Sequence, residues 1–225
     1  MDIITDLPIG EHYILIKLSG GADSSIIYYA LCDKFKDRDD VKIIVITLDT
    51  DFKDQYISSA RRVITLVKKL TGKEPYDHLT NIVKHSNENY VNGQNELYEL
   101  ANKKYPITMS YSGITRNPPH KEMVDFFNIK IKELNLNEEM VWEAINSRDV
   151  PRDNYTSTTR GRPFANFDKK ATVSAYNYYK MTDILYPITF SCESAPYNID
   201  SNGIPIHCGE CFFCLERWWG FGRLI

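Results

Sequence analysis

A run of small and polar residues near the N-terminus has the composition of an anion-binding loop. It consists of Ser19, Gly20, Gly21, Ala22, Asp23, Ser24 and Ser25. Glycines let the backbone approach an anion closely, and the first amides of a following helix direct partial positive charge at phosphate oxygens. Asp23 suits such a place only if it holds Mg²⁺ or hydrogen-bonds the loop itself. The alternative is a tight strand-to-helix turn in which a serine or the aspartate caps the helix.

Four of the five cysteines gather near the C-terminus with the spacing of a metal site. They are Cys192, Cys208, Cys211 and Cys214. Two-residue spacings let successive thiolates bind one ion, and a thiolate from a preceding segment completes a tetrahedral Zn²⁺ site. Such a closed site is structural, because it leaves no position for a substrate. An iron–sulfur cluster and buried free thiols are the alternatives, and His207 is either a competing ligand or simply a neighbour.

The elements that must position these residues alternate between strand and helix patterns. Apolar runs predict strands at 13–18, 41–48 and 106–111, and the intervening patterns predict helices at 23–32 and 54–70. Further helices are expected at 121–134, 137–147 and 169–179, with a loop at 148–166. The alternation predicts an α/β sandwich with a parallel sheet covered by helices. We expect an α/β domain at 1–190 and a cysteine-bearing element at 191–225 packed on it.

Composition excludes some broad classes of protein. The 225 residues are 43% hydrophobic with a net charge of −3, which is ordinary for a globular protein and gives no reason to expect nucleic acid as a partner. No segment approaches the ~18 consecutive apolar residues of a membrane span, and the acidic N-terminus does not resemble a signal peptide. The clustered cysteines favour a reducing compartment, so we expect a cytoplasmic location. A homodimer is left open.

The loop at 19–25, in its strand–loop–helix setting, resembles the PP-loop of the N-type ATP-pyrophosphatase superfamily. It is not a Walker A loop, since no Gly-Lys-Ser/Thr follows it. The resemblance implies a Rossmann-like fold of the adenine nucleotide alpha hydrolase kind, with ATP bound by residues 19–25. It places the adenine near the end of the second strand, at Thr47, Leu48 and Asp49. It also implies cleavage of ATP between its α and β phosphates, with AMP transferred to an oxygen of the acceptor.

Further stretches resemble the 7-cyano-7-deazaguanine (preQ0) synthase family of queuosine biosynthesis. They are the cysteine tail followed by Leu-Glu-Arg at 215–217, the segment 163–169, the segment 189–192, and Tyr111-Ser112-Gly113 followed by Arg116. The resemblance implies that Lys169 lies near the ATP phosphates and acts in catalysis with Asp23. It implies that a strand at 189–192 delivers Cys192, and that Ser112, Gly113 and Arg116 bind the substrate, with Gly113 also touching the nucleotide.

The activity that this family implies is an ATP-dependent ligation. ATP adenylates 7-carboxy-7-deazaguanine, ammonia displaces AMP to give the amide, and a second ATP drives dehydration to the nitrile. Mg²⁺, Lys169 and the loop amides would stabilise the leaving groups, and no protein nucleophile is needed. This agrees with a sequence that offers no persuasive Ser-His-Asp or Cys-His arrangement.

The substrate loop departs from the family pattern, which keeps other functions open. Acidic residues flank Tyr-Ser-Gly in the family, whereas Ser110 and Ile114-Thr115 occupy those places here. An Arg-Asn motif after the third strand is represented only by Arg116-Asn117. The alternatives are a divergent PP-loop ATPase active in tRNA modification, sulfur transfer or defence-associated modification, or a non-catalytic nucleotide-binding partner protein.

Two other features each have two interpretations. Arg148, Arg152, Arg160 and Arg162 precede Lys169 and form either a solvated loop or a flap that closes over phosphates or an anionic substrate. The aromatic segment 218–221 is either a hydrophobic plug or a dimer surface.

Overall fold

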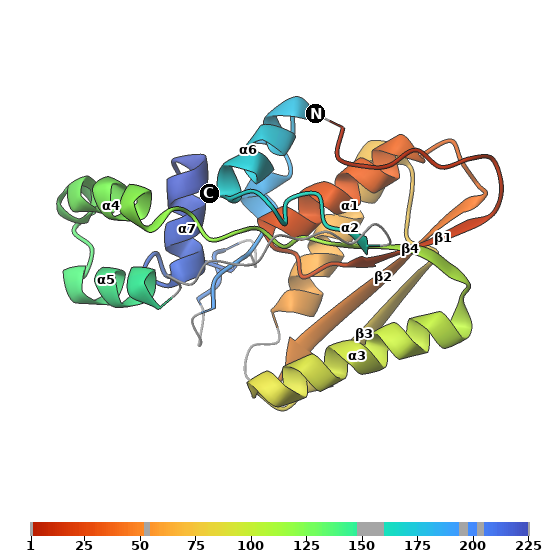
Figure 1. Ribbon diagram of the computed structural model, residues 1–225, viewed down its shortest axis with the longest axis horizontal. Helices are drawn as coiled ribbons and strands as arrows, with labels where there is room; N and C mark the ends of the chain where they lie inside the picture. The colour runs from red at the N-terminus through yellow and green to blue at the C-terminus, as the bar shows by residue number, and fades with distance from the viewer. Residues whose placement is uncertain (1, 52–54, 148–159, 194–197, 202–204, 225) are drawn as a thin grey trace.

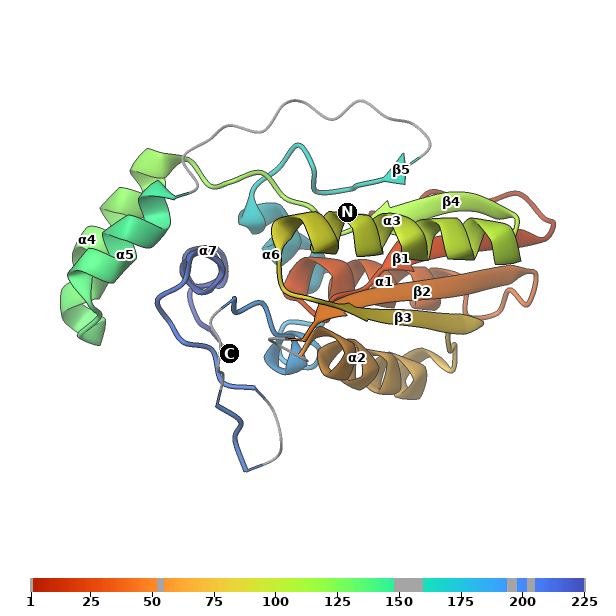
Figure 2. The same cartoon turned by 90° about the horizontal axis from the view of Figure 1, so that it is seen from below.

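A parallel five-stranded sheet forms the centre of the computed structural model, which describes residues 2–51, 55–147, 160–193, 198–201 and 205–224. The strand order is β3-β2-β1-β4-β5, and every pairing is parallel. Figure 2 shows this order from β5 to β3. The strands are β1 His12–Lys17, β2 Val41–Thr50, β3 Asp77–Val83, β4 Ile107–Ser112 and β5 Arg160–Gly161. The predicted parallel α/β fold is confirmed.

Helices cover both faces of this sheet, and the side chains of β1 show how. Ile14 and Ile16 belong to the core beneath α1 (Ala22–Lys34) and α2 (Tyr56–Thr71). Leu15 points the opposite way, into the core beneath α3 (Asn87–Lys104). Successive strand residues point to opposite faces, so a run that is apolar throughout is buried on both. The two layers of helices lie on either side of the sheet in Figure 1.

A second core lies beside the sheet, among helices from the later half of the chain. Helices α4 (His120–Leu134) and α5 (Glu138–Asn146) pack on α7 (Phe212–Phe221), at the left of Figure 1. Phe127, Val141, Leu215 and Trp219 are among its buried residues. Trp219 is thus interior, and Phe221 stacks on Tyr186 with ring centroids 3.9 Å apart. This arrangement agrees with the plug interpretation of the aromatic segment.

Helix α6 (Lys169–Tyr178) and the short 3₁₀ helix η1 (Tyr186–Ile188) connect the two cores. Tyr176 in α6 donates from its hydroxyl to the carbonyl of Ala22 at 3.0 Å, which joins α6 to the start of α1. After η1 the chain runs toward Cys192 without entering the sheet. The strand expected at 189–192 is therefore wrong. A single backbone bond, from Phe190 N to Gly20 O at 2.9 Å, replaces a ladder there.

Strand β3 and helix α3 lie between 72 and 105, where the sequence analysis predicted no element. Arg148 and Arg152, with most of the arginine-rich segment, lie outside the described residues. Among the described helices, none is both long enough and apolar enough to cross a membrane.

Candidate functional site

The loop after β1 leaves the first turn of α1 open to a ligand. Gly20 has φ +76°, and a Cβ there would overlap with the side chain and backbone of Ser59 in α2, so only glycine fits. Gly21 is the N-cap of α1 and has no side chain to place over the helix end. Ser24 donates to the carbonyl of Gly21 at 3.3 Å, and its Oγ lies 3.2 Å from that of Ser19. The turn is therefore tight, and serine hydroxyls accept from its amides: Gly21 N–H donates to Oγ of Ser19 at 3.3 Å and Ala22 N–H to Oγ of Ser191 at 3.4 Å.

This loop borders a cleft of about 430 Å³ at the carboxyl ends of the strands. Parallel sheets bind ligands at this edge. The predicted site residues that line the cleft are Ser19, Gly21, Asp23, Ser24, Ser112, Gly113 and Lys169. Gly20, Ala22, Ser25 and Arg116 do not line it. Arg116 donates its backbone N–H to the carbonyl of Phe167 at 2.8 Å.

The end of β4 fits directly against the phosphate loop. Gly113 lies so close that a Cβ there would overlap with the backbone between Asp23 and Ser24. Ser112, the last residue of β4, and Thr115 are buried beside it. The predicted substrate loop and the predicted phosphate loop therefore form adjoining walls of one cleft, which is the geometry that transfer of a group between two substrates needs.

Lys169 lies at the centre of an ion-pair network in this cleft. Its Nζ is 2.6 Å from Oδ2 of Asp23 and 3.0 Å from Oε2 of Glu216. Thr172 donates to the other carboxylate oxygen of Asp23 at 2.6 Å. Burial alone would lower the pKa of Lys169, but the carboxylates of Asp23 and Glu216 outweigh it and raise that pKa. The ammonium is therefore held charged beside the loop.

The start of α6 explains why Lys169 is held there. Asp168 is the N-cap of the helix and accepts from the backbone N–H of Lys170 at 2.9 Å. The helix thus begins at Lys169, which is only 4% exposed, while Lys170 points outward to pair with Glu122. Lys169 therefore lies inside the cleft, whereas Lys170, the next residue of the helix, makes a surface ion pair.

Thr47, Leu48 and Asp49 are buried at the end of β2 and do not line the described cleft. Thr47 donates to the carbonyl of Leu18 at 2.7 Å and so supports the chain just before the phosphate loop. Asp49 accepts from the backbone N–H of Ile57 at 2.9 Å, near the start of α2. Their contacts are structural in this state, and the adenine position assigned to them stays a prediction.

Two residues of the cleft were given no role from the sequence. Glu216 in α7 accepts from the hydroxyl of Thr115 at 3.4 Å in addition to pairing with Lys169. Lys17 ends β1, and its Nζ stands 5.1 Å above the ring of Tyr90 in α3. Arg162 is the one of the four arginines whose described side chain lines the cleft. The signal for Lys17 in the sequence was that its charged side chain interrupts the apolar run at 13–18.

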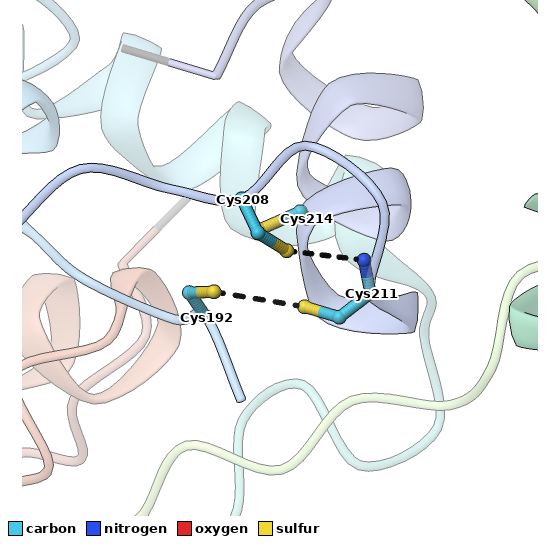
Figure 3. A group of neighbouring side chains, drawn as sticks. All are labelled: Cys192, Cys208, Cys211 and Cys214. Atoms are coloured by element: carbon cyan, nitrogen blue, oxygen red, sulfur yellow. Dashed lines mark hydrogen bonds between the residues drawn. The ribbon is translucent and has the colours of Figure 1, made fainter. Parts of the chain in front are cut away.

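The four C-terminal cysteines form a site that fits one tetrahedral ion. All four sulfurs lie within 4.8 Å of one another (Figure 3). The Sγ atoms of Cys192 and Cys211 are 3.9 Å apart, as are those of Cys208 and Cys214. A Zn–S tetrahedron with bonds of about 2.3 Å has edges of about 3.8 Å. Thiolates on separate irons of a cluster stand farther apart, so the sulfur positions favour a single ion.

Backbone amides complete the cysteine site. Glu210 and Cys211 donate their N–H groups to Sγ of Cys208 at 3.4 and 3.3 Å. Glu193 donates its N–H to Sγ of Cys211 at 3.5 Å. Such donors stabilise negative charge on sulfur, which thiolate ligands carry. The predicted ligand set therefore meets in space from two separate segments.

A buried arginine joins this cysteine element to the phosphate loop. Arg217 is 1% exposed and donates to the carbonyl of Leu224 at 2.6 Å, to Oγ1 of Thr189 at 2.8 Å and to the carbonyl of Tyr186 at 3.0 Å. It also donates to Oγ of Ser191 at 3.4 Å, and this oxygen in turn accepts from Ala22 N at 3.4 Å. The positions of α7 and of the loop are thus linked by direct bonds.

Replacing Arg217 by methionine is expected to lower the free energy of unfolding by about 3 kcal/mol or more, because two buried acceptors and one partly buried acceptor lose their donor. Urea unfolding measures this loss. Arg223→Met is the matched control, since Arg223 also lies over the Tyr186 ring but is 41% exposed. Its effect should stay below about 1 kcal/mol. Equal losses in the two variants would contradict the structural role of Arg217.

No protein-family model matches the sequence, and no curated protein does. Two of the solved structures that align with this chain have low sequence identity to it. The U34-tRNA thiolase NcsA from Methanococcus maripaludis, determined with its [4Fe-4S] cluster, aligns with a TM-score of 0.47 and 12% identity, over 98% of this chain and 73% of that one. The NAD+ synthetase from Burkholderia pseudomallei aligns with a TM-score of 0.42 and 12% identity, over 94% of this chain and 74% of that one.

Proposed function

We propose that the protein is a PP-loop ATP pyrophosphatase that adenylates a carboxylate. The observation that carries this proposal is the shared cleft of the 19–25 loop, the ion pair between Asp23 and Lys169, and the end of β4 at Gly113. An open helix N-terminus, a charged lysine and an adjoining second wall are the parts that nucleotidyl transfer requires.

The roles of the chain's own residues follow from these positions. The N-terminus of α1 would face the phosphates, and Ser19 and Ser24 offer hydroxyl donors beside them. The N–H groups of Gly21 and Ala22 would exchange their serine acceptors for phosphate oxygens. The ammonium of Lys169 stabilises the charge that develops on departing pyrophosphate. Glu216 and Asp23 keep it oriented at 3.0 and 2.6 Å.

Metal ions have two separate places in this proposal. The carboxylate of Asp23 lines the cleft and offers the oxygen ligands that Mg²⁺ prefers, so it would hold the ion that ATP brings. Mg²⁺ would supply neutralisation of the phosphate charge. The four cysteines would hold Zn²⁺, whose closed coordination keeps the start of α7 in place.

We propose 7-carboxy-7-deazaguanine as the acceptor, with ammonia as the second substrate and preQ0 as the product. The carboxylate displaces pyrophosphate from ATP, ammonia displaces AMP to give the amide, and a second ATP activates the amide oxygen, which then leaves with AMP as the nitrile forms. The resemblance of the Ser112-Gly113 loop and of the cysteine tail supports this acceptor. In the family an acidic residue follows the Tyr-Ser-Gly segment, and Ile114-Thr115 occupy that place here. The hydroxyl of Thr115 donates to Glu216, which brings a carboxylate to the same wall of the cleft.

Pyrophosphate release from ATP tests the proposal. With ATP and 7-carboxy-7-deazaguanine alone we expect pyrophosphate release limited to a single turnover, because the adenylate then has no ammonia to react with. Adding ammonium should give sustained release, with the nitrile identified by mass spectrometry. Release with ATP alone, or equally with and without the acid, would point to another acceptor. A protein that binds ATP but never releases pyrophosphate would contradict the enzymatic proposal and favour a nucleotide-binding partner protein.

A further inference from the structure

The lysine that ends β1 carries a charge that the phosphate loop does not use. Leu15, two residues earlier, belongs to the core beneath α3, so Lys17 also points to the α3 face. Its Nζ lies over the ring of Tyr90 in α3 and has no carboxylate partner in the part of the chain that the structure describes. The first turn of α1 lies on the opposite face. Lys17 thus adds a positively charged side chain to the cleft, on the face of the sheet away from the N-terminus of α1.

A second cation lies close to Lys17. Arg162, from the segment after β5, lines the same cleft. Burial lowers the pKa of Lys17 to about 8, and the positive charge of Arg162 contributes to the shift. Two like charges brought together at a partly buried place repel each other. An anion bound between them would relieve that repulsion, which is how basic binding sites are built.

Aromatic side chains line the same cleft, and Tyr90 is the one that lies against Lys17. Tyr56 at the start of α2, Tyr90 in α3, Phe190, and Phe212 and Phe213 at the start of α7 all line the cleft. Gln94, one turn after Tyr90, adds an amide that can both donate and accept. Tyr90 beside Lys17, with Arg162 on the same cleft, suits a flat ring that carries a negative group, because rings stack on rings and the charge is paired at the edge.

We propose that the part of the cleft on the α3 side is the acceptor subsite, and that it takes a planar ring bearing a carboxylate held by Lys17 and Arg162. This inference rests on the proposed function, because it names where the acid to be adenylated lies. The carboxylate would stand across the end of β1 from the loop that holds the phosphates. That arrangement brings an attacking carboxylate oxygen toward the phosphates from the opposite wall.

Binding measurements test the subsite separately from catalysis. Indole-3-carboxylate and the neutral indole-3-carboxamide serve as planar probes, followed by ligand-observed NMR titration. The acid should bind the wild-type protein, and the amide should bind at least about tenfold more weakly. Lys17→Met should weaken binding of the acid by at least about tenfold, and Lys17→Arg should restore most of it. Arg162→Gln should weaken it in the same direction.

Lys42→Met is the matched control. Lys42 also lies on a strand with its Nζ 5.3 Å above a tyrosine ring, that of Tyr76, but it sits near the other end of the sheet. This variant should bind the acid like wild type. Calorimetry with α,β-methylene-ATP, which cannot be cleaved between the α and β phosphates, should give the same affinity for wild type and Lys17→Met.

Three results would overturn the subsite. The first is wild-type protein that binds the acid and the amide equally well. The second is Lys17→Met protein that binds the acid as tightly as wild type. The third is Lys17→Met protein whose affinity for α,β-methylene-ATP falls as much as its affinity for the acid, which would assign Lys17 to the nucleotide. A failed proposed function gives a different pattern. The acid would then bind through Lys17, and yet no acid would provoke pyrophosphate release.

Discussion

Replacing Lys169 by methionine and Glu216 by glutamine in one protein is expected to reduce pyrophosphate release by at least about 100-fold. The cause is loss of the ammonium that lies 2.6 Å from Asp23 at the edge of the phosphate loop. The double variant is preferred for a physical reason. Lys169→Met alone leaves the buried carboxylate of Glu216 and the partly buried carboxylate of Asp23 without their cation, and breaking a buried ion pair costs about 3–5 kcal/mol. Once Glu216 is also replaced by a neutral glutamine, only Asp23 keeps its charge, and Thr172 still donates to it.

The matched control for this experiment is Lys170→Met. Lys170 is the next residue of the same helix, but it pairs with Glu122 at the surface and lies 4.2 Å above the ring of Trp219. Its loss should leave turnover near the wild-type rate. Pyrophosphate release is measured with saturating ATP, and urea unfolding shows that each protein is folded. A folded double variant that turns over like wild type would remove Lys169 from the proposed mechanism.

The parts of the site that could be predicted are those that local sequence determines. The loop at 19–25 is one contiguous string, and its conformation follows from a strand end, two glycines and a helix start. The cysteines at 208, 211 and 214 are close enough in sequence to share one ion, so only Cys192 had to come from elsewhere. Lys169 was found because the contiguous segment 163–169 resembles a family motif that opens a helix, and Asp168 does cap that helix.

The other cleft residues could not be predicted, because they meet only through the fold. Lys17, Tyr90 and Glu216 are separated by long stretches of chain. Lys17 and Tyr90 belong to no string that indicates a role, and the Leu-Glu-Arg string at 215–217 gave Glu216 a resemblance but no role. The assignment at Thr47 to Asp49 shows the converse difficulty. Polar residues at a strand end can support neighbouring backbone, as Thr47 and Asp49 do here, rather than face a ligand.

Strand β3 and helix α3 escaped prediction for a related reason. β3 is an edge strand whose residues are at most partly buried, so its apolar pattern is weak. In α3 only Gly93, Leu97 and Ala101 are buried, among many polar residues. Packing against the sheet, more than intrinsic propensity, determines both elements. This matters for the site, because α3 supplies the Tyr90 wall of the cleft.

Replacing Cys211 by serine is expected to remove the metal ion and to destabilise the C-terminal element by several kcal/mol. Metal binding by thiolates is folding free energy, about 10–16 kcal/mol for an isolated zinc-finger peptide. The loss here should be smaller, since the sheet and its helices remain. Cys211 is the N-cap of α7, the helix that carries Glu216 and Arg217. Loss of the ion should therefore also loosen the cleft and lower pyrophosphate release.

Cys32→Ala is the matched control, because Cys32 is the fifth cysteine and is buried in α1 away from the cluster. Elemental analysis should find one zinc per chain in wild type and in this control, and none in Cys211→Ser. A chelator should lower the melting temperature of wild type toward that of Cys211→Ser without changing the latter. Iron with visible absorption in the purified protein would contradict the zinc assignment. The four thiolates of an iron–sulfur cluster would lie farther apart than 4.8 Å. The turn at 208–211 would therefore have to move away from Cys192.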